Sequence, residues 1–347
     1  MRLVERRRAA RTASLLAERS FAPPSGGELE KSPPPRRRGS GPGFLSDVAK
    51  NALSALAPLR ESIERVGARR CQLVQGSERP FELWQELRER TEGRLDVSGR
   101  EVLELGPGRS LGMGLIFLAA GARRVVAVDR YRHLFWDDLD CNHLRGVLDR
   151  LEEERWPYAQ RARSAVRTIT TGHVEFDPDA LVYRQADGAA LPLESDAVDL
   201  CYSNAVLEHV HEPAVVVGEL ARVIRPGGDS IHEIDFRDHF DQGDRLRLLT
   251  FPEWEWQART RFRPGYTNRW RRADFLRAFA AAGFEHRTGR VTNAVPLEAV
   301  EVWRPRMVAR FRDRPAEDLS TLSYWGWWTR NEPAARAHLT DSPVEER

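Results

Sequence analysis

The stretch Glu101-Val-Leu-Glu-Leu-Gly-Pro-Gly-Arg-Ser110 decides how the rest of the chain is interpreted. Residues 101–105 form a short apolar run, Gly106-Pro-Gly108 interrupts it, and residues 111–120 have the length and apolar content of a helix. This order predicts a strand, a tight turn and a helix. Gly106 and Gly108 would let the backbone approach a ligand closely because they carry no Cβ, and the unpaired N–H groups of the helix N-terminus would face the same space.

An acidic residue follows at the distance that a nucleotide-binding unit requires. A second short strand, residues 124–128, ends in Asp129 about 20 residues after the turn, where such βαβ units place an acid for ribose hydroxyls. The turn lacks the third glycine of a dinucleotide fingerprint, since Ser110 follows Gly108 and Arg109. An ordinary strand-to-helix connection is therefore the alternative to a ligand-binding turn. The order of the later segments distinguishes the two interpretations.

Strands and helices keep alternating along the chain. Further strands are predicted at 181–187, 197–204, 229–236, 285–292 and 322–329, and Pro226-Gly227-Gly228 is predicted to end the helix before residue 229. Alternation of this kind predicts an α/β fold, here a Rossmann-like, seven-stranded, mostly parallel sheet with helices on both faces and an antiparallel last strand. Ligands of such sheets bind beyond the carboxyl ends of the strands. Five candidate residues fall at these ends: Glu104, Gly106, Asp129, Asp187 and Asn204.

Composition divides the chain into segments. Residues 1–43 carry arginine clusters and proline runs and are predicted to be a disordered tail, with ten Lys/Arg against four Asp/Glu in residues 1–40. Residues 44–100 are predicted to hold two amphipathic helices, 44–60 and 80–92, that cap the core. The domain proper is predicted at 101–330, with a helical insertion at about 140–175 and a lid rich in Trp and Arg at about 240–272. Residues 331–347 are predicted to be a second disordered tail.

Bulk properties exclude several classes of protein. The whole chain carries a net charge of +2, so the residues after 40 sum to −4 and give no reason to expect a nucleic-acid groove. Cys71, Cys141 and Cys201 are too far apart for a zinc ribbon and do not suggest a disulfide scaffold. No apolar run reaches the roughly 20 residues that cross a bilayer. We therefore expect a cytoplasmic protein without a nucleic-acid partner, and the sequence leaves its oligomeric state open.

Five motifs, in order, resemble those of class I S-adenosylmethionine-dependent methyltransferases, and most closely the small-molecule type (methyltransferase type 11) found in ubiquinone and menaquinone biosynthesis. They are Val102–Gly108, Val128-Asp129, Ala186-Asp187-Gly188, Val198–Val210 and Leu220–Gly228. The resemblance runs from about residue 101 to 236. It departs from the family at Ser110, where a further glycine is common, and in the long segment 144–170.

The resemblance implies S-adenosylmethionine as cofactor and a role for each matching residue. Gly106 and Gly108 would pass under the methionine part and Glu104 would receive its amino group. Asp129 would accept the ribose hydroxyls, Asp187, followed by Gly188, the adenine amino group, and Asn204 would line the floor beneath the methyl group. Turn and helix-capping roles are the alternatives for Asp187 and Asp129.

Methylation of a hydroxyl needs a base, and the segment 231–240 is rich in groups that could supply one. We expect the base to be His239 or His232, and Asp235 is a third candidate for a catalytic residue. Strand alternation predicts His232 and Ile234 on one face and Glu233 and Asp235 on the other. His209 is expected to be a packing residue. Asp235, Asp238 and His239 could in principle hold a magnesium ion, but no metal is predicted.

These features predict an enzyme that methylates a small molecule, and the expected acceptor is an oxygen of a sugar or another hydroxyl-bearing metabolite. One alternative is a carbon methyltransferase acting on a quinone-like or aromatic ring, which would have an apolar acceptor pocket and little need of His232 or His239. The other alternative is a cofactor-binding pseudoenzyme whose basic tail binds a partner.

Overall fold

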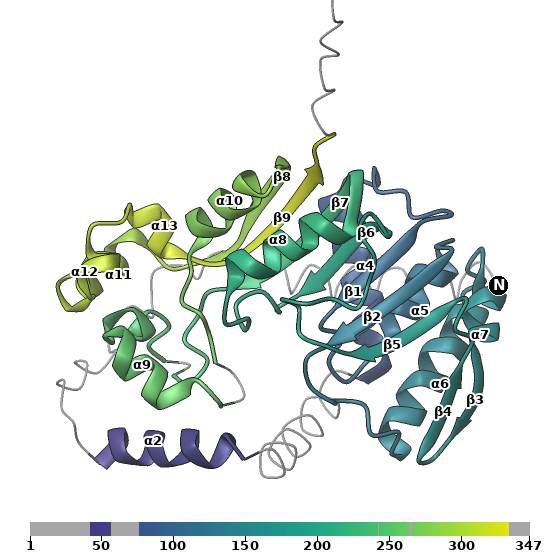
Figure 1. Ribbon diagram of the computed structural model, residues 1–347, viewed down its shortest axis with the longest axis horizontal. Helices are drawn as coiled ribbons and strands as arrows, with labels where there is room; N and C mark the ends of the chain where they lie inside the picture. Colours follow the sequence, from purple (N-terminus) through teal and green to yellow (C-terminus); the bar gives the residue numbers. More distant parts are fainter. Residues whose placement is uncertain (1–41, 57–75, 242, 264–265, 333–347) are drawn as a thin grey trace, which may run out of the picture. The chain divides into compact units, whose positions relative to one another are not determined.

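The computed structural model describes residues 42–56, 76–241, 243–263 and 266–332 (Figure 1). The predicted tail 1–43 lies outside the described residues except for its last two, which begin helix α2 (Pro42–Ser54). Of the predicted tail 331–347, only residues 331 and 332 are described. The helix predicted at 44–60 is thus observed over its first part, and its last residues are outside the described ranges.

Seven strands of the described chain form one sheet, in the order β5, β2, β1, β6, β7, β9, β8. Their bounds are β1 Glu101–Leu105, β2 Arg124–Asp129, β5 Leu181–Gln185, β6 Val198–Asn204, β7 Ile224–Asp235, β8 Phe284–Ala294 and β9 Thr321–Arg330. The strands from β5 to β7 pair in parallel, whereas β9 runs antiparallel to both β7 and β8. The predicted Rossmann-like fold is confirmed, and its antiparallel last strand lies between β7 and β8.

The centre of the sheet is its most deeply buried part. All five residues of β1 are buried, as expected for a parallel strand covered on both faces. From β1 the chain moves outward to β2 and β5, and it then returns to the other side of β1 to form β6 and β7. The strand order therefore reverses between β1 and β6, and a crevice for a ligand opens beyond the carboxyl ends of the strands at such a point.

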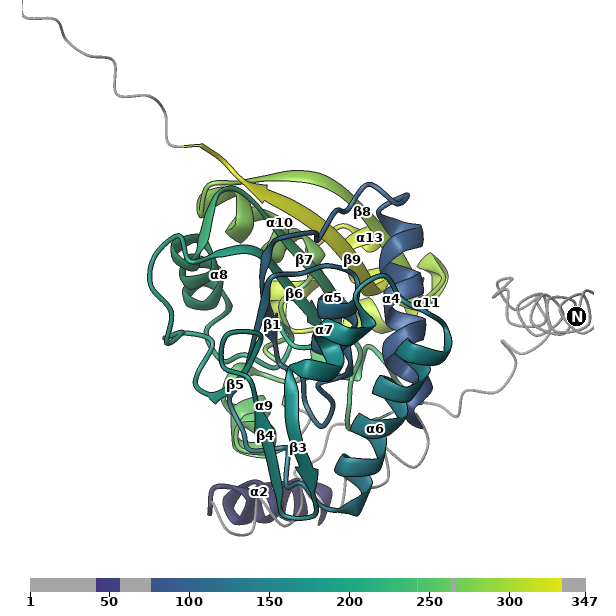
Figure 2. The same cartoon turned by 90° about the vertical axis from the view of Figure 1, so that its right-hand side faces the viewer.

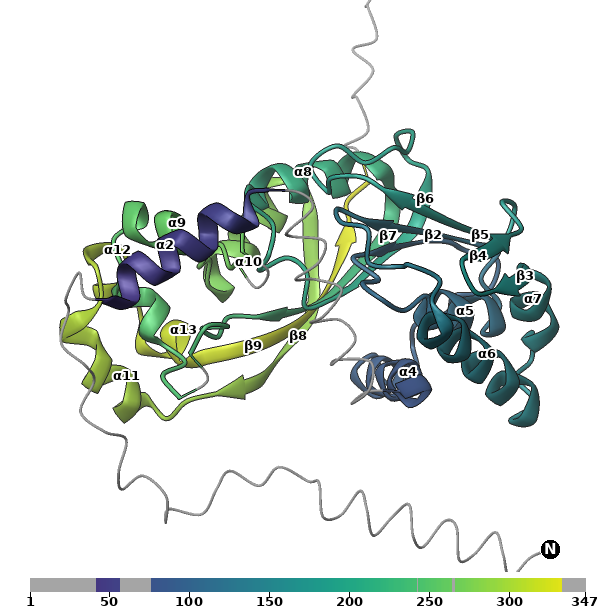
Figure 3. The ribbon, with the colours of Figure 1, turned by 90° about the horizontal axis from the view of Figure 1, so that it is seen from below.

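Helices cover both faces of the sheet (Figures 2 and 3). On one face lie η1 (Gly76–Glu78), α4 (Arg79–Arg90), α5 (Gly112–Ala119), α6 (Asp138–Glu153) and α7 (Ala159–Ser164); on the other lie α8 (Pro213–Val223) and α10 (Arg272–Ala281). Every residue of α5 is buried, which is why this helix is apolar all round rather than amphipathic. Each face has its own cluster of buried apolar side chains.

A third apolar cluster is built from the segments that follow β7 and β8. Its residues come mainly from η2 (Arg247–Thr250), α9 (Glu253–Thr260), α11 (Leu297–Trp303), α12 (Ala309–Arg312) and α13 (Ala316–Ser320), and η3 (Arg304–Arg306) connects α11 to α12. Helix α2 is attached to this cluster through α9, because Asn51 Nδ2 donates to the carbonyl of Ala258 at 2.9 Å and Asp47 pairs with Arg259 at 2.8 Å. Of the two helices expected to cap the core, α4 therefore packs on the sheet, whereas α2 packs on α9.

The structure corrects two further expectations. The predicted helical insertion at about 140–175 is helical only through α6 and α7, and it ends in an antiparallel hairpin of β3 (Val166–Thr170) and β4 (His173–Phe176). The leucines at helical spacing stop at Leu151, and β-branched residues then favour strands. The glycines at 227 and 228 do not end a helix before a new strand, because β7 already begins at Ile224, which pairs with Val198.

Candidate functional site

The turn after β1 has the backbone that its glycines allow. Gly106 and Gly108 have φ of +68° and +62°, a conformation that strains other L-residues. A Cβ on Gly106 would lie 2.5 Å from Cγ2 of Val206, so this glycine also permits close packing against the segment after β6. A Cβ on Gly108 would meet nothing within 4 Å. The turn is thus packed on one side and, at Gly108, faces open space.

Glu104 is a buried carboxyl group with an unused oxygen. Its side chain is 5% exposed, and Oε2 has no hydrogen-bond partner in the structure. Burial raises the pKa of Glu104 to about 8. A hydrogen bond from the N–H of Gly114 opposes this rise, and the nearby carboxylate of Asp129 adds to it. An unsatisfied buried polar atom costs about 1–3 kcal/mol, so Glu104 is poised to accept a donor, and most favourably a cationic one.

Asp129 ends β2 beside this turn. Its Oδ2 accepts a hydrogen bond from the N–H of Gly108 at 3.0 Å, and its Oδ1 accepts one from the N–H of Tyr131 at 3.0 Å. Burial raises the pKa of Asp129, while His133, with Nε2 3.6 Å from Oδ1, and these N–H groups oppose the rise. The carboxylate is therefore held at the carboxyl end of β2 by backbone donors.

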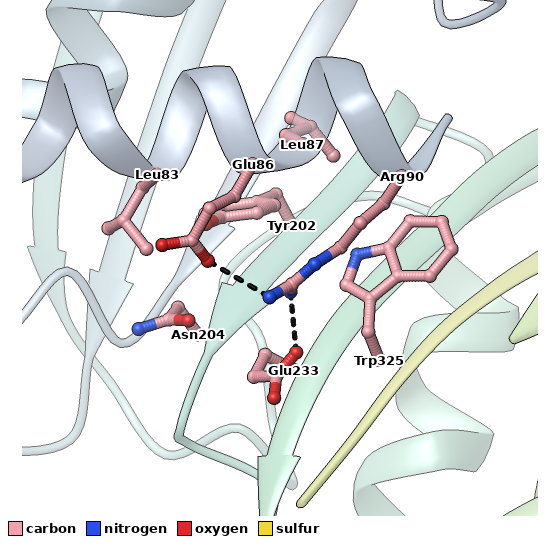
Figure 4. A pocket seen from close by; sticks show the side chains of 8 residues that line it. All are labelled: Leu83, Glu86, Leu87, Arg90, Tyr202, Asn204, Glu233 and Trp325. Carbon is pink, nitrogen blue, oxygen red and sulfur yellow. Dashed lines mark hydrogen bonds and ion pairs between the residues drawn. The ribbon is translucent and has the colours of Figure 1, made fainter. Parts of the chain in front are cut away.

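Asp187 follows the end of β5, and Asn204 is the last residue of β6. Asp187 is exposed; it accepts a hydrogen bond from the N–H of Ala189 at 3.0 Å, as in an Asx turn, and lies 3.3 Å from Nε of Arg130. Gly188 is buried beside Val216. The Asn204 side chain is half-buried and lines a small pocket under α4 (Figure 4). The residues predicted for the cofactor thus all lie along the carboxyl ends of β1, β2, β5 and β6.

His232 belongs to the core. It is 0% exposed, its Nδ1 lies 2.7 Å from Oγ of Ser203, and its Nε2 lies 2.6 Å from Oγ of Ser230. Burial lowers the pKa of His232 to about 3. A neutral histidine with both ring nitrogens engaged has none left for a substrate proton, so the structure removes His232 from the candidate bases. Its side chain faces α10, opposite to Glu233, as strand alternation predicts.

His239 and Asp235 lie together at the end of β7. Nε2 of His239 is 3.5 Å from Oδ2 of Asp235, and Arg237 binds the same carboxylate. Although burial alone would raise it, the contacts with His239 and Arg237 hold the pKa of Asp235 well below its usual range. An ionised carboxylate that orients a histidine ring is the arrangement used in general-base catalysis.

A second histidine, which the sequence indicated as packing, lies beside this pair. The ring centroids of His209 and His239 are 5.0 Å apart, and Nδ1 of His209 lies 2.6 Å from the carbonyl of Tyr266. Burial and His239 lower the pKa of His209 to about 4. Its Nδ1 must carry the proton to donate to that carbonyl, which leaves the lone pair on Nε2.

Glu208 is a residue that sequence reasoning missed. It is 2% exposed, neither carboxylate oxygen makes a well-formed hydrogen bond, and Oε1 lies 3.8 Å from Nε2 of His209. Burial raises the pKa of Glu208 well above its usual range. The only signal in the sequence was its place in Leu207-Glu-His-Val210, directly before a histidine at a strand end.

The Asp238 carboxylate stabilises the turn that follows it in the chain. Its Oδ1 accepts hydrogen bonds from the N–H groups of Phe240 and Asp241, and its Oδ2 lies 3.3 Å from Nε of Arg247. Within the described ranges, no group of three or more His, Cys, Asp or Glu side chains is arranged to hold a metal ion.

The predicted lid at 240–272 is largely a packed layer. Trp256, Arg269 and Arg271 are buried; the Arg269 guanidinium donates to the carbonyls of Leu248 and Phe251. Arg271 donates to the carbonyls of three residues, Phe236, Leu319 and Thr321. These arginines therefore hold backbone together and are not available to a substrate. The layer still borders the site, because the N–H of Asn268 donates to the carbonyl of Glu208.

The strand order, the glycine turn after the central strand and the acids at the strand ends are the features on which the resemblance to class I S-adenosylmethionine-dependent methyltransferases rests. Residues 158–231 of the chain match the family described as Methyltransferase domain. Over this segment the chain is therefore similar to a methyltransferase domain.

Relatives match over short segments. The uncharacterized methyltransferase of Mycobacteroides abscessus is 43% identical over 60 residues, which are 17% of this chain and 23% of that protein. The uncharacterized methyltransferase of Mycobacterium ulcerans is 52% identical over 44 residues, which are 13% of this chain and 17% of that protein. The chain spans about a fifth of the length of these curated relatives. The crystal structure of an S-adenosylmethionine-dependent methyltransferase from Mesorhizobium loti aligns with 74% of this chain and 100% of its own, at 18% identity and a TM-score of 0.42.

Among the described residues, no helix is both long and apolar enough to cross a membrane.

Proposed function

We propose that the protein is an enzyme that transfers the methyl group of S-adenosylmethionine to a hydroxyl oxygen of a small molecule in the cytoplasm. The observation that carries the proposal is the unused Oε2 of buried Glu104, next to a turn that faces open space at Gly108. The α-ammonium group of the cofactor would give this carboxylate the partner it lacks.

The residues at the strand ends fit the cofactor. Glu104 would hold the ammonium group, and the turn at Gly106 and Gly108 would carry the methionine part. Asp129, already fixed by Gly108, would accept ribose hydroxyls. Asp187 keeps an exposed carboxylate for the adenine amino group, and Asn204 would lie beneath the methyl group.

When bound, S-adenosylmethionine supplies a methyl group on a sulfonium, whose C–S bond breaks with its electron pair going to sulfur as the new C–O bond forms. The acceptor oxygen supplies the electron pair for that bond and must lose its proton. His239 would take this proton on Nδ1, because Asp235 lies at Nε2 and can accept the ring N–H there. The carboxylate then stabilises the charged imidazolium.

Helix α4 and the layer around α9 would exclude water from the crevice, which is the other requirement of methyl transfer. Methyl transfer consumes the positive charge of the sulfonium, so positioning matters more than strong electrostatic stabilisation.

The test is cofactor binding followed by turnover. Calorimetric titration of S-adenosylhomocysteine into the full chain should show micromolar affinity, and Glu104→Gln should weaken it at least tenfold. With an acceptor found by screening sugars and phenols, His239→Asn and Asp235→Asn should lower kcat at least a hundredfold and leave cofactor affinity unchanged. Absence of cofactor binding would refute the proposal. Undiminished kcat in both variants would favour a carbon acceptor, and tight cofactor binding without turnover on any acceptor would favour a pseudoenzyme.

A further inference from the structure

Helix α2 turns its polar side toward the protein. Nδ2 of Asn51 donates to the carbonyl of Ala258 at 2.9 Å, and its Oδ1 accepts a hydrogen bond from the N–H of Phe262 at 2.7 Å. The carbonyl of Ala258 belongs to the last turn of α9, where carbonyl groups have no partner within the helix. Asp47, one turn before Asn51, pairs with Arg259 at 2.8 Å. Polar contacts therefore attach α2 to α9.

The opposite side of α2 is apolar and faces solvent. We call it the apolar stripe, and it consists of Leu45, Ala49, Ala52 and Leu53, with Leu56 in the turn that follows the helix. The positions i, i+4, i+7, i+8 and i+11 fall on one side of a helix. Leu45, Leu53 and Leu56 are 69%, 52% and 56% exposed. The apolar spacing predicts a helix that caps the core with this side, whereas in the structure this side faces outward.

Within the described ranges, no element covers the apolar stripe. Figures 1 and 3 show α2 lying along α9, with no described helix or strand on the side of α2 that faces away from α9. Single exposed apolar side chains are normal on protein surfaces, but a continuous row of them marks a surface that contacts a protein or a membrane. The apolar stripe therefore requires an occupant.

The charges around α2 suit an anionic occupant. Lys50 is exposed, whereas Asp47, the one acid in residues 42–56, is paired with Arg259. The segment that precedes α2 is basic, since residues 1–40 contain ten Lys/Arg against four Asp/Glu and Arg36-Arg37-Arg38 is separated from Pro42 by three residues. The residues after 40 have a net charge of −4. Positive charge is thus concentrated, along the sequence, next to the apolar stripe.

A tryptophan adjoins the start of this helix. Trp254 of α9 is 67% exposed, and its ring meets that of Phe44, in the first turn of α2, edge to face with centroids 6.3 Å apart. Indole combines an apolar body with an N–H group that needs a hydrogen-bond acceptor, so Trp is enriched where a membrane meets water.

The size of the apolar stripe favours a bilayer over a second protein. A stable interface between proteins buries about 800 Å² on each partner and involves about 20–30 residues a side. The apolar stripe has five side chains, and two of them are alanines. An amphipathic helix that lies in the plane of a membrane surface has to bury only its apolar side, and basic residues beside it add attraction to anionic lipids.

We propose that the apolar stripe of α2 docks the protein on a membrane surface that contains anionic lipids. The helix lies parallel to the surface, with its leucines among the upper acyl chains, Lys50 at the headgroups and its polar side on α9. Trp254 lies at the same boundary between lipid and water. This inference does not depend on the proposed function.

The experiment measures binding of the full chain to vesicles by flotation. Vesicles of phosphatidylcholine alone are compared with vesicles of equal parts phosphatidylcholine and phosphatidylglycerol, and the wild type should bind the anionic vesicles at least tenfold more tightly. Leu53→Gln combined with Leu56→Gln should weaken this binding at least tenfold. The matched control combines Val215→Gln and Val302→Gln, which lie on α8 and α11 and are 48% and 64% exposed in the wild type, and it should bind as the wild type does.

A variant that enlarges the apolar stripe provides a second measurement. Ala52 is exposed, so Ala52→Leu adds apolar surface without disturbing packing, and it should strengthen binding to the anionic vesicles severalfold. Far-UV circular dichroism and thermal unfolding show whether each variant is folded. If the glutamine variant does not fold, the effect of Ala52→Leu decides alone.

Three results would overturn the inference. The first is a wild type that does not bind the anionic vesicles. The second is equal binding by the wild type and the folded glutamine variant, or by the wild type and Ala52→Leu, because charge without the apolar stripe would then account for it. The third comes from sedimentation velocity without vesicles: a wild-type dimer that the glutamine variant abolishes would assign the apolar stripe to a second copy of the chain.

Discussion

The backbone N–H of Gly108 donates a hydrogen bond of 3.0 Å to Oδ2 of Asp129 and so joins the turn after β1 to the end of β2. The carboxylate is fixed before any ligand arrives, which lowers the conformational entropy that the Asp129 side chain would lose when a ribose binds. The same bond sets the conformation of the glycine turn. Cofactor affinity therefore depends on Asp129 both as a contact and as a support of the turn.

Asp129→Ala should weaken S-adenosylhomocysteine binding at least tenfold, which corresponds to about 1.4 kcal/mol, because it removes a charged acceptor and frees Gly108. The Asp129→Asn side chain can still accept a hydrogen bond from the N–H of Gly108, so the affinity of this variant should lie between those of the wild type and Asp129→Ala. Calorimetry measures both, with the exposed Asp179→Ala as control. Equal affinities in the wild type and Asp129→Ala would show that this carboxylate does not contact the ligand.

Gly106→Ala should destabilise the fold more than Gly93→Ala. Both glycines have nearly the same φ, +68° and +69°, so alanine is strained in the same way at each. Only at Gly106 would the new Cβ strike Val206, whereas at Gly93 it meets nothing within 4 Å. Urea unfolding should show a further loss of about 1–3 kcal/mol for Gly106→Ala. A smaller difference would mean that the segment around Val206 moves freely.

Cofactor affinity should rise with pH between 6 and 8. The free carboxyl group of Glu104, with a pKa of about 8, is mostly protonated at pH 6 and must lose that proton to pair with an ammonium group. Asp129 and Tyr202 are the titratable groups that act on it electrostatically. The affinity should increase up to tenfold per pH unit. Glu104→Gln should bind more weakly and lose this dependence.

Titration in buffers of different ionisation enthalpy gives an independent measurement. At pH 7 the wild type should release close to one proton for each molecule of S-adenosylhomocysteine bound, and Glu104→Gln should release none from this site. Binding without proton release in the wild type would mean that the cofactor does not contact Glu104.

The wild type should lose stability on acidification because of His232. Its pKa is about 3 in the folded protein and about 6.5 when exposed, so the unfolded chain binds a proton that the folded chain cannot. The contribution of the neutral ring is complete above about pH 6.5 and declines toward pH 3, by up to about 1.4 kcal/mol per pH unit. Urea unfolding at pH 7, 6 and 5 should show a shallower decline for His232→Gln than for the exposed control His173→Gln. Equal slopes would contradict the assignment of His232 to the core.

Local pattern was sufficient for the class of fold and for the positions of the candidate cofactor residues at the strand ends. Gly106, Gly108, Glu104, Asp129 and Asn204 could be found from the sequence because each stands directly after or inside a short apolar run, and strand ends of a parallel sheet converge whatever the lengths of the connections. The hairpin of β3 and β4 was missed because a helical pattern was extended past Leu151, where it had ended.

Only the tertiary structure decided which chemical groups are available. His232 and His239 are equivalent in the sequence, but packing against α10 and β9 buries the first, while the turn after β7 leaves the second beside Asp235. The pairing of Arg90 with Glu233 joins residues 143 positions apart. The sequence by itself determined the alternation of strands and helices along the chain and the residues at the strand ends, because these depend on short-range periodicity. Burial, ion pairing and pKa depend on which segments meet in space, and the sequence pattern does not contain that information.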